Sequence, residues 1–190
     1  MPRPSKEQVV LGLFFDYPTK HWHFSELEKE SCIAASKLDK WLKRFIQDNL
    51  ILRIKEKGRM PYYTANHENL EYRLRKRLFT LSMLYSSGLL SYLASLKAKN
   101  IIIFGSFTRS DWHKESDIDI FVYGDCKSLD IGRYESILHR NIEIFPAKDR
   151  KDLLRMGTGL LRNILSGMTI TGSIPEEVLN ACLQKPGRSS

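Results

Sequence analysis

One stretch of the chain, NIIIFGSFTRSDWHKESDIDIFVY (residues 100–123), constrains the fold more than any other. It opens with an apolar, β-branched run that ends at a Gly-Ser pair, which is typical of a buried strand followed by a tight turn. It closes with alternating acidic and apolar residues. Because successive side chains of a strand point to opposite faces, Asp117 and Asp119 share one face, while Ile118 and Ile120 point into the core.

Two carboxylates on one strand face repel each other unless a positive charge lies between them. A divalent cation can supply that charge, and Mg²⁺ or Mn²⁺ suits hard oxygen ligands combined with substrate phosphates. Gly105 allows a backbone to approach phosphate closely, and the Ser106 hydroxyl can donate to phosphate oxygens. Arg109 and Lys114 carry positive charge that a polyphosphate would attract. The next expected strand, RNIEIFP, offers Glu143 as the third carboxylate of a two-metal site.

The segments GSFTRS and SDIDIFV together resemble the DNA polymerase β-like nucleotidyltransferase superfamily. Within it they are most similar to the minimal nucleotidyltransferase (MNT) branch, whose pattern is GSxxRG, a short spacer and SDxDxxV. The resemblance spans roughly residues 98–175. It implies a small mixed sheet with flanking helices. It also implies transfer of a nucleoside monophosphate from a nucleoside triphosphate, usually ATP, to a hydroxyl, with release of pyrophosphate.

Carried over to this chain, the resemblance implies Gly105 and Ser106 at the triphosphate and Asp117 and Asp119 as metal ligands and catalytic residues. Glu143 becomes the possible third carboxylate, which is both catalytic and metal-binding. Two residues depart from the pattern.

Ser110 stands where the family has Gly, which puts the turn geometry in question, and Glu143 stands where Asp is commoner. A glutamate is one methylene longer and can still reach a metal. Trp112, in the spacer, could at most border a nucleotide base.

The charge of the chain is unevenly distributed. Residues 1–100 hold 18 Lys/Arg and 10 Asp/Glu, whereas residues 101–190 hold 12 of each, so the whole net charge of +8 lies in the first hundred residues. A basic N-terminal part joined to a neutral C-terminal part suggests two functions, the first with a polyanion as partner. A solvated basic face is the simpler interpretation of the same charge.

The N-terminal part shows helical and then strand-like patterns. EQVVLGLFFDYP predicts a helix that ends near Pro18, and Ser25 is expected to cap a second helix. In the next segment Leu38, Trp41, Leu42 and Phe45 recur at the spacing of one buried helical stripe. LILRIKEKGRMPYYTAN then predicts two short strands about a Lys-Gly turn.

A helix, a second helix, a basic helix and a basic hairpin, in that order, resemble the winged helix-turn-helix family over about residues 5–66. In that family the third helix enters the major groove and the hairpin touches the DNA backbone. The resemblance therefore implies DNA contacts from seven residues, which are Ser36, Lys37, Lys40, Lys43, Arg44, Lys57 and Arg59. Winged helices also serve as protein-interaction modules, which leaves that alternative open.

The predicted fold class is α+β, with four segments along the chain. They are a winged helix-turn-helix domain (1–66), a long or once-broken connecting helix (67–99), a nucleotidyltransferase-like domain (100–183) with a mixed sheet and flanking helices, and a disordered tail (184–190). The connecting helix offers a surface for a possible homodimer.

Three functions fit this organisation. The first is a metal-dependent nucleotidyltransferase, with ATP as the expected donor and Mg²⁺ or Mn²⁺ as cofactor, that acts on an unknown protein or nucleic-acid acceptor and is brought to its target by a DNA-binding domain. The second is a DNA-binding transcriptional regulator whose C-terminal domain senses a nucleotide with weak or no catalysis. The third, implied by the MNT resemblance, is an antitoxin that modifies or covers a HEPN ribonuclease.

Other classes of protein fit poorly. Three separated cysteines without a CxxC pair argue against a disulfide scaffold and a zinc module. No apolar run reaches the length that spans a bilayer, and the N-terminal residues do not read as a signal peptide, so we expect a cytoplasmic protein without a membrane partner.

Overall fold

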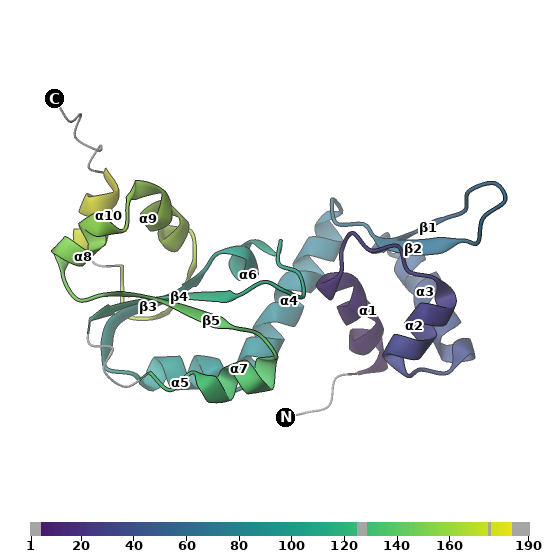
Figure 1. The fold of residues 1–190 in the computed structure, drawn as a ribbon, viewed down its shortest axis with the longest axis horizontal. Helices are drawn as coiled ribbons and strands as arrows, with labels where there is room; N and C mark the ends of the chain where they lie inside the picture. Colours follow the sequence, from purple (N-terminus) through teal and green to yellow (C-terminus); the bar gives the residue numbers. More distant parts are fainter. Residues whose placement is uncertain (1–4, 125–128, 175, 184–190) are drawn as a thin grey trace. The chain divides into compact units, whose positions relative to one another are not determined.

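The computed structural model of the chain describes residues 5–124, 129–174 and 176–183. The predicted tail, residues 184–190, lies outside the described residues. The chain divides into two units, the first formed by Met1–Ser82 with Trp112–Lys114 and the second by Met83–Asp111 with Glu115–Ser190. Figure 1 labels most of the helices and strands, and each unit is described in turn.

Three helices open the N-terminal unit, α1 (Lys6–Asp16), α2 (Phe24–Ser31) and α3 (Ala35–Gln47). The first begins at a capping box in which Ser5 and Gln8 each accept a hydrogen bond from the other's backbone N–H. The predicted cap of α2 at Ser25 is wrong. His23 is the N-cap, and the Glu26 carboxylate accepts its backbone N–H at 2.8 Å, so α2 begins one residue before Ser25.

The buried stripe predicted for α3 is present in part. Leu38, Leu42 and Phe45 are buried, but Trp41 is only half-buried, with its ring stacked on Phe45 and under the Arg44 guanidinium. The exposed face of α3 carries Lys37, Lys40, Lys43 and Arg44.

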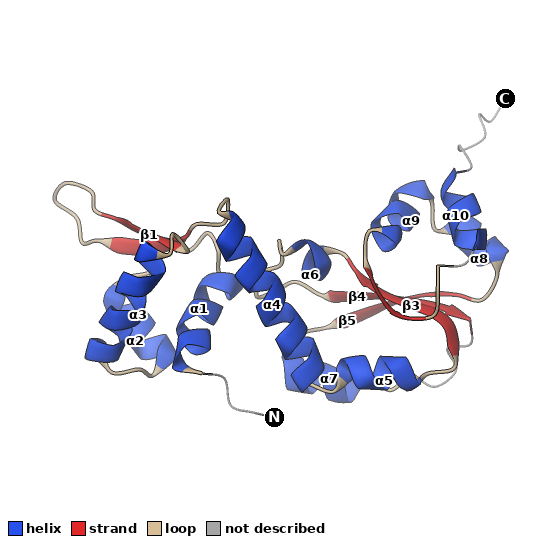
Figure 2. Ribbon diagram, turned by 180° about the vertical axis from the view of Figure 1, so that it is seen from behind, coloured by secondary structure: helices blue, strands red, loops and turns tan. Residues whose placement is uncertain are grey.

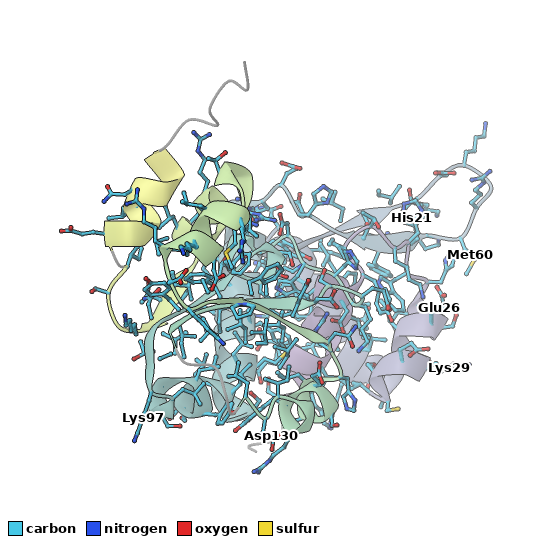
Figure 3. All side chains as sticks on the ribbon, turned by 60° about the vertical axis from the view of Figure 1, so that its left-hand side comes forward. His21, Glu26, Lys29, Met60, Lys97 and Asp130 are labelled. Atoms are coloured by element: carbon cyan, nitrogen blue, oxygen red, sulfur yellow. The ribbon has the colours of Figure 1, made fainter. Side chains whose placement is uncertain are left out.

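A two-stranded hairpin follows α3, as predicted. Strands β1 (Ile51–Ile54) and β2 (Tyr62–Ala65) are antiparallel. Trp22, from the segment before α2, adds a short bridge to Tyr63 through two backbone hydrogen bonds of 2.8 Å each. His21 stacks on Tyr62 at 4.1 Å between ring centroids, and Figure 3 shows His21 beside the hairpin and Met60 farther along it.

The helix predicted over residues 67–99 is two helices, α4 (Leu70–Ser86) and α5 (Leu89–Ser95), bent by 63° at their junction. The break falls at Gly88, whose φ of 81° lies in the left-handed region that favours glycine. The last two residues of the predicted helix already belong to strand β3 (Ala98–Phe104). No single helix within the described ranges is long and apolar enough to cross a membrane; α4 and α5 satisfy that test only as a bent pair, by length and composition.

Trp112 is fully buried in the N-terminal unit. Its indole N–H donates to the Thr80 hydroxyl at 2.8 Å, and its ring stacks on Phe79 and lies 4.3 Å from the Lys76 ammonium. Lys76, itself buried, donates to the carbonyls of Phe15 and Trp112. The expectation that Trp112 borders a nucleotide base is therefore wrong, because the side chain is enclosed by α4.

The C-terminal unit contains a four-stranded mixed sheet in the order β5-β4-β3-β6. Its strands are β3, β4 (Ile118–Gly124), β5 (Ile142–Ala147) and β6 (Met168–Thr171). Strand β3 is antiparallel to β4 and β6, while β4 and β5 are parallel. The predicted α+β class and mixed sheet with flanking helices are confirmed.

Helices cover both faces of this sheet (Figures 1 and 2). The helices α8 (Arg150–Arg155), α9 (Thr158–Leu165) and α10 (Glu176–Leu183) lie on one face, and α5 and α7 (Gly132–Leu138) lie on the other. The first face encloses a core in which Phe104 and Phe121 of the sheet are packed with Leu153, Leu161 and Ile164 of the helices. A short helix, α6 (Ser106–Arg109), directly follows β3.

Candidate active site

The turn from β3 to α6 depends on a glycine. Gly105 has φ 75° and ψ −150°, and a Cβ placed on it would overlap Oδ2 of Asp119 and lie 3.0 Å from its Cγ. Phe104 and Asp119 are partners in the antiparallel β3–β4 register, which brings the turn beside the start of β4. The carboxylate of Asp119 thus occupies the space that a side chain at position 105 would need.

The three predicted carboxylates lie at the start of two neighbouring strands. Asp119 pairs in register with Glu143 across the parallel β4–β5 ladder, and Asp117 lies just before β4. Asp119 is half-buried, whereas Asp117 and Glu143 are exposed. Ile118 and Ile120 are fully buried, which confirms the predicted alternation.

The electrostatics of this group are unfavourable for negative charge. Burial raises the pKa of Asp119, the neighbouring charges of Glu143 and Asp117 raise it further, and the Arg109 guanidinium acts in the opposite direction. In the described part of the chain, no group of three His, Cys, Asp or Glu residues is arranged to hold a metal ion by itself.

Arg109 is held in place by two neighbours. Its Nε donates to Asp111 at 3.0 Å and its Nη1 donates to the side-chain oxygen of Asn163 at 2.8 Å. Asn163 lies on α9, 54 residues away in the chain, and sequence reasoning missed it. Ser106, the predicted phosphate contact, is half-buried in the first turn of α6.

Ser110, which stands where the family pattern has Gly, adopts a left-handed backbone conformation. Its φ is 67°, and its backbone N–H donates to the Ser106 carbonyl at the end of α6. A residue with a Cβ pays roughly 1–2 kcal/mol for this left-handed conformation. Serine at this position therefore adds strain to the turn.

Arg140 is a second residue that the sequence did not reveal. It is buried, its Nη1 donates to the Ser116 carbonyl at 3.3 Å, and its guanidinium lies 5.2 Å from the centre of the Phe107 ring. Phe107 follows Ser106, and Ser116 precedes Asp117. Arg140 thus contacts both the segment after the Gly-Ser turn and the segment before the two aspartates.

Lys114 is the one predicted phosphate contact that belongs to the N-terminal unit. There its backbone N–H donates to the Asp16 carbonyl at 2.8 Å. Gly105, Ser106 and Arg109 lie within one short element, with Gly105 as the N-cap of α6, Ser106 as its first residue and Arg109 as its last.

The residues predicted to contact DNA are exposed in the N-terminal unit. Ser36, Lys37, Lys40, Lys43 and Arg44 lie on α3, and Lys57 and Arg59 lie between β1 and β2. Three of the cations form surface ion pairs, which are Lys43 with Asp39, Arg44 with Asp48, and Arg59 with Glu56. Such surface ion pairs contribute little to stability.

The comparison with family models gave a match that covers three strands of the C-terminal unit. Residues 87–154 match the model of the nucleotidyltransferase domain. The match includes β3, β4 and β5, and with them the Gly-Ser turn, both aspartates and Glu143. It supports placing this segment in the nucleotidyltransferase superfamily. Comparisons with curated proteins and with solved structures gave no match.

A first prediction concerns the turn between β3 and α6. The substitution Gly105→Ala should destabilise the C-terminal unit by about 2 kcal/mol or more, because it combines a positive φ with a clash against Asp119. Gly159→Ala is the matched control. It lies on α9 with nothing within 4 Å of its added Cβ, and a gain of up to about 1 kcal/mol is expected. Urea unfolding followed by circular dichroism measures both, and equal stability of Gly105→Ala and the wild type would contradict this account of the turn.

A second prediction concerns pH. The folded-state pKa of Asp119 is raised above its ordinary value of 3.8. The folded protein is therefore fully stabilised by neutral Asp119 below pH 3.8, and this stabilisation is lost as the pH rises through the folded-state pKa. In buffer with EDTA, Asp119→Asn should therefore raise the Tm at pH 7 and lose this advantage near pH 3. The exposed Asp130→Asn is the control and should change stability by less than about 0.5 kcal/mol. A lower Tm for Asp119→Asn at pH 7 would show that the carboxylate is not electrostatically strained.

Proposed function

We propose that the chain transfers a nucleoside monophosphate from a nucleoside triphosphate, with ATP as the first candidate, to a hydroxyl of an acceptor and releases pyrophosphate. The observation that carries this proposal is the close approach of the Asp119 carboxylate to Gly105, with Glu143 in register beside it. The arrangement lies inside the segment that matches the nucleotidyltransferase domain.

In this proposal the triphosphate binds at α6 and at the glycine that precedes it. Gly105 presents backbone without a side chain, the Ser106 hydroxyl donates, and the Arg109 guanidinium supplies positive charge. Arg109 is already oriented by Asp111 and Asn163, so little side-chain entropy is lost when a phosphate approaches.

The carboxylates fit a divalent cation. All are hard oxygen donors, and burial together with the charges of Glu143 and Asp117 raises the pKa of Asp119, so a cation bound there would stabilise its ionised form. Mg²⁺ commonly binds one or two carboxylates and takes its remaining ligands from substrate phosphates and water, so a preformed protein cluster of three is not required. Asp117 and Asp119 would hold the ion with Glu143 as a possible third ligand. When bound, the ion would supply charge stabilisation for the phosphates and the attacking oxygen.

The transfer itself is an in-line displacement. The acceptor hydroxyl oxygen forms a bond to the α-phosphorus while the bond between this phosphorus and the bridging oxygen breaks, and pyrophosphate departs with that electron pair. The hydroxyl proton passes to a carboxylate, for which the exposed Glu143 is the candidate. Arg109 stabilises the charge that develops on the phosphates.

For the N-terminal unit we propose DNA binding as a winged helix-turn-helix domain. Its order of elements, α1, α2, α3, β1 and β2, matches the order expected for that family. The exposed cations on α3 and on the hairpin support contact with phosphates.

The catalytic proposal is tested by incubating the protein with α-³²P-ATP and Mg²⁺ or Mn²⁺, alone and with cell lysate. We expect label on a protein or nucleic acid from α-³²P-ATP but not from γ-³²P-ATP. The double variant Asp117→Asn/Asp119→Asn should lose transfer by at least about 100-fold, and Asp130→Asn should retain it. Label that persists in the double variant overturns the assignment of the site. Absence of transfer with intact nucleotide binding would favour the regulator that only senses a nucleotide.

The DNA proposal predicts strong salt dependence. The variant Lys40→Glu/Arg44→Glu should abolish specific binding and, for the residual nonspecific binding, reduce the slope of log K against log[salt] by about 2. Lys97→Glu/Lys151→Glu changes the net charge equally at exposed lysines of the other unit, and it should affect binding far less. Fluorescence anisotropy over a salt series measures both. Equal losses for the two variants, or binding that ignores salt, would contradict a DNA-binding face on α3.

A further inference from the structure

Helix α4 is apolar on two opposite faces. One face is packed on α1. The Tyr72 hydroxyl donates to the Phe14 carbonyl at 2.8 Å, and the Phe15 ring lies between Tyr72 and Phe79 at 5.2 and 5.3 Å. This packing accounts for one side of the helix only.

The second face is a row of leucines in water. Leu70, Leu74 and Leu78 are 67%, 45% and 66% exposed, and Leu81 is half-buried. Their spacing of four, four and three residues places them on one stripe of the helix. A solvated helix face normally carries charged or polar residues, and consecutive leucines at this spacing indicate a surface that is covered in the functional protein.

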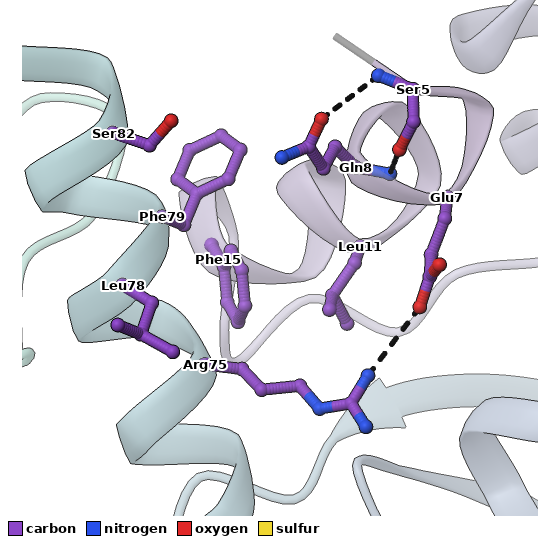
Figure 4. A pocket seen from close by; sticks show the side chains of 9 residues that line it. All are labelled: Ser5, Glu7, Gln8, Leu11, Phe15, Arg75, Leu78, Phe79 and Ser82. Atoms are coloured by element: carbon purple, nitrogen blue, oxygen red, sulfur yellow. Dashed lines mark hydrogen bonds and ion pairs between the residues drawn. The ribbon is translucent and has the colours of Figure 1, made fainter.

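A groove runs beside the leucine row. It has a volume of about 540 Å³ and is lined by Leu11 and Phe15 of α1 and by Leu78 and Phe79 of α4 (Figure 4). Leu78 is thus both a wall of the groove and part of the exposed ridge. A ridge and a hollow next to each other on one surface can pair with a rotated copy of themselves, which is the requirement for a two-fold interface.

The cation at the groove already has counterions within the chain. Arg75 donates to Glu71 at 2.8 Å and to Glu7 and Asp48 at 3.4 Å each. If a partner surface covered this side of the groove, Arg75 would keep its counterions. The groove therefore suits an apolar partner surface better than a charged small molecule.

We infer that the leucine row and groove of α4 form the contact between two copies of this chain, with the two α4 helices antiparallel and crossing near Leu78. All charges of α4 lie between Glu71 and Arg77, and residues 78–86 carry none. In an antiparallel pair the basic half of each helix lies against the uncharged half of the other. A parallel pair would bring the exposed Arg73 and Arg77 of both copies together, which is repulsive.

The oligomeric state of the full-length chain tests the contact. Light scattering after size exclusion should give twice the chain mass of 22.1 kDa for the wild type. Leu74→Glu/Leu78→Glu should give a single chain mass with unchanged circular dichroism, because both side chains are exposed and their replacement does not disturb the monomer. Leu154→Glu, an equally exposed leucine of α8 in the other unit, is the control and should remain dimeric.

Disulfide trapping tests the orientation in a chain whose three natural cysteines are replaced by serine. Leu78→Cys lies near the two-fold axis and should form a cross-linked dimer. Leu70→Cys lies eight residues away, so its copies would be separated by about 24 Å and should not cross-link. Cross-linking at both positions overturns the antiparallel arrangement. A wild-type chain that stays monomeric at about 100 µM, or a dimer that survives the glutamate substitutions, overturns the contact and assigns the leucine row to a different partner.

Discussion

The carboxylate of Asp119 occupies the space in which every residue except glycine would carry its Cβ at position 105. This contact fixes the distance between the β3–α6 turn and the start of β4, and the other site residues take their positions from it. Ser106 and Arg109 follow the turn, and Glu143 is placed by its register with Asp119. The site is thus a consequence of backbone packing between two strands, with few side-chain contacts within it.

The surrounding fold supports this arrangement from three directions. Buried isoleucines on either side of Asp119 anchor β4 in the core, so the strand backbone cannot turn this face away from the β3–α6 turn without loss of packing. Arg140 ties the segment before the aspartates to Phe107, and Asn163 orients Arg109. Burial of Asp119 and the proximity of Glu143 and Asp117 make its negative charge unfavourable, and a bound cation would relieve this unfavourable energy.

Local patterns allowed much of this to be predicted from the sequence. Alternation at residues 117–120 gave the strand and its faces, and the Gly-Ser pair gave the turn, because both depend on neighbours in the chain. The roles of Asn163 and Arg140 could not be predicted, since each acts on a residue 54 or 24 positions away. Trp112 was misjudged for the same reason. Its partners on α4 are more than thirty residues distant, and the spacer sequence gives no sign that Trp112 belongs to the N-terminal unit.

The most direct test of the central claim is a calorimetric titration of the protein with α,β-methylene-ATP, which binds but cannot release pyrophosphate, in the presence and absence of Mn²⁺. The account predicts that Mn²⁺ tightens binding of this analogue by at least about tenfold, or 1.4 kcal/mol, and that Asp119→Asn removes the difference. Binding that is equally strong without the metal, or unchanged in Asp119→Asn, would contradict a metal–nucleotide site at Gly105 and Asp119.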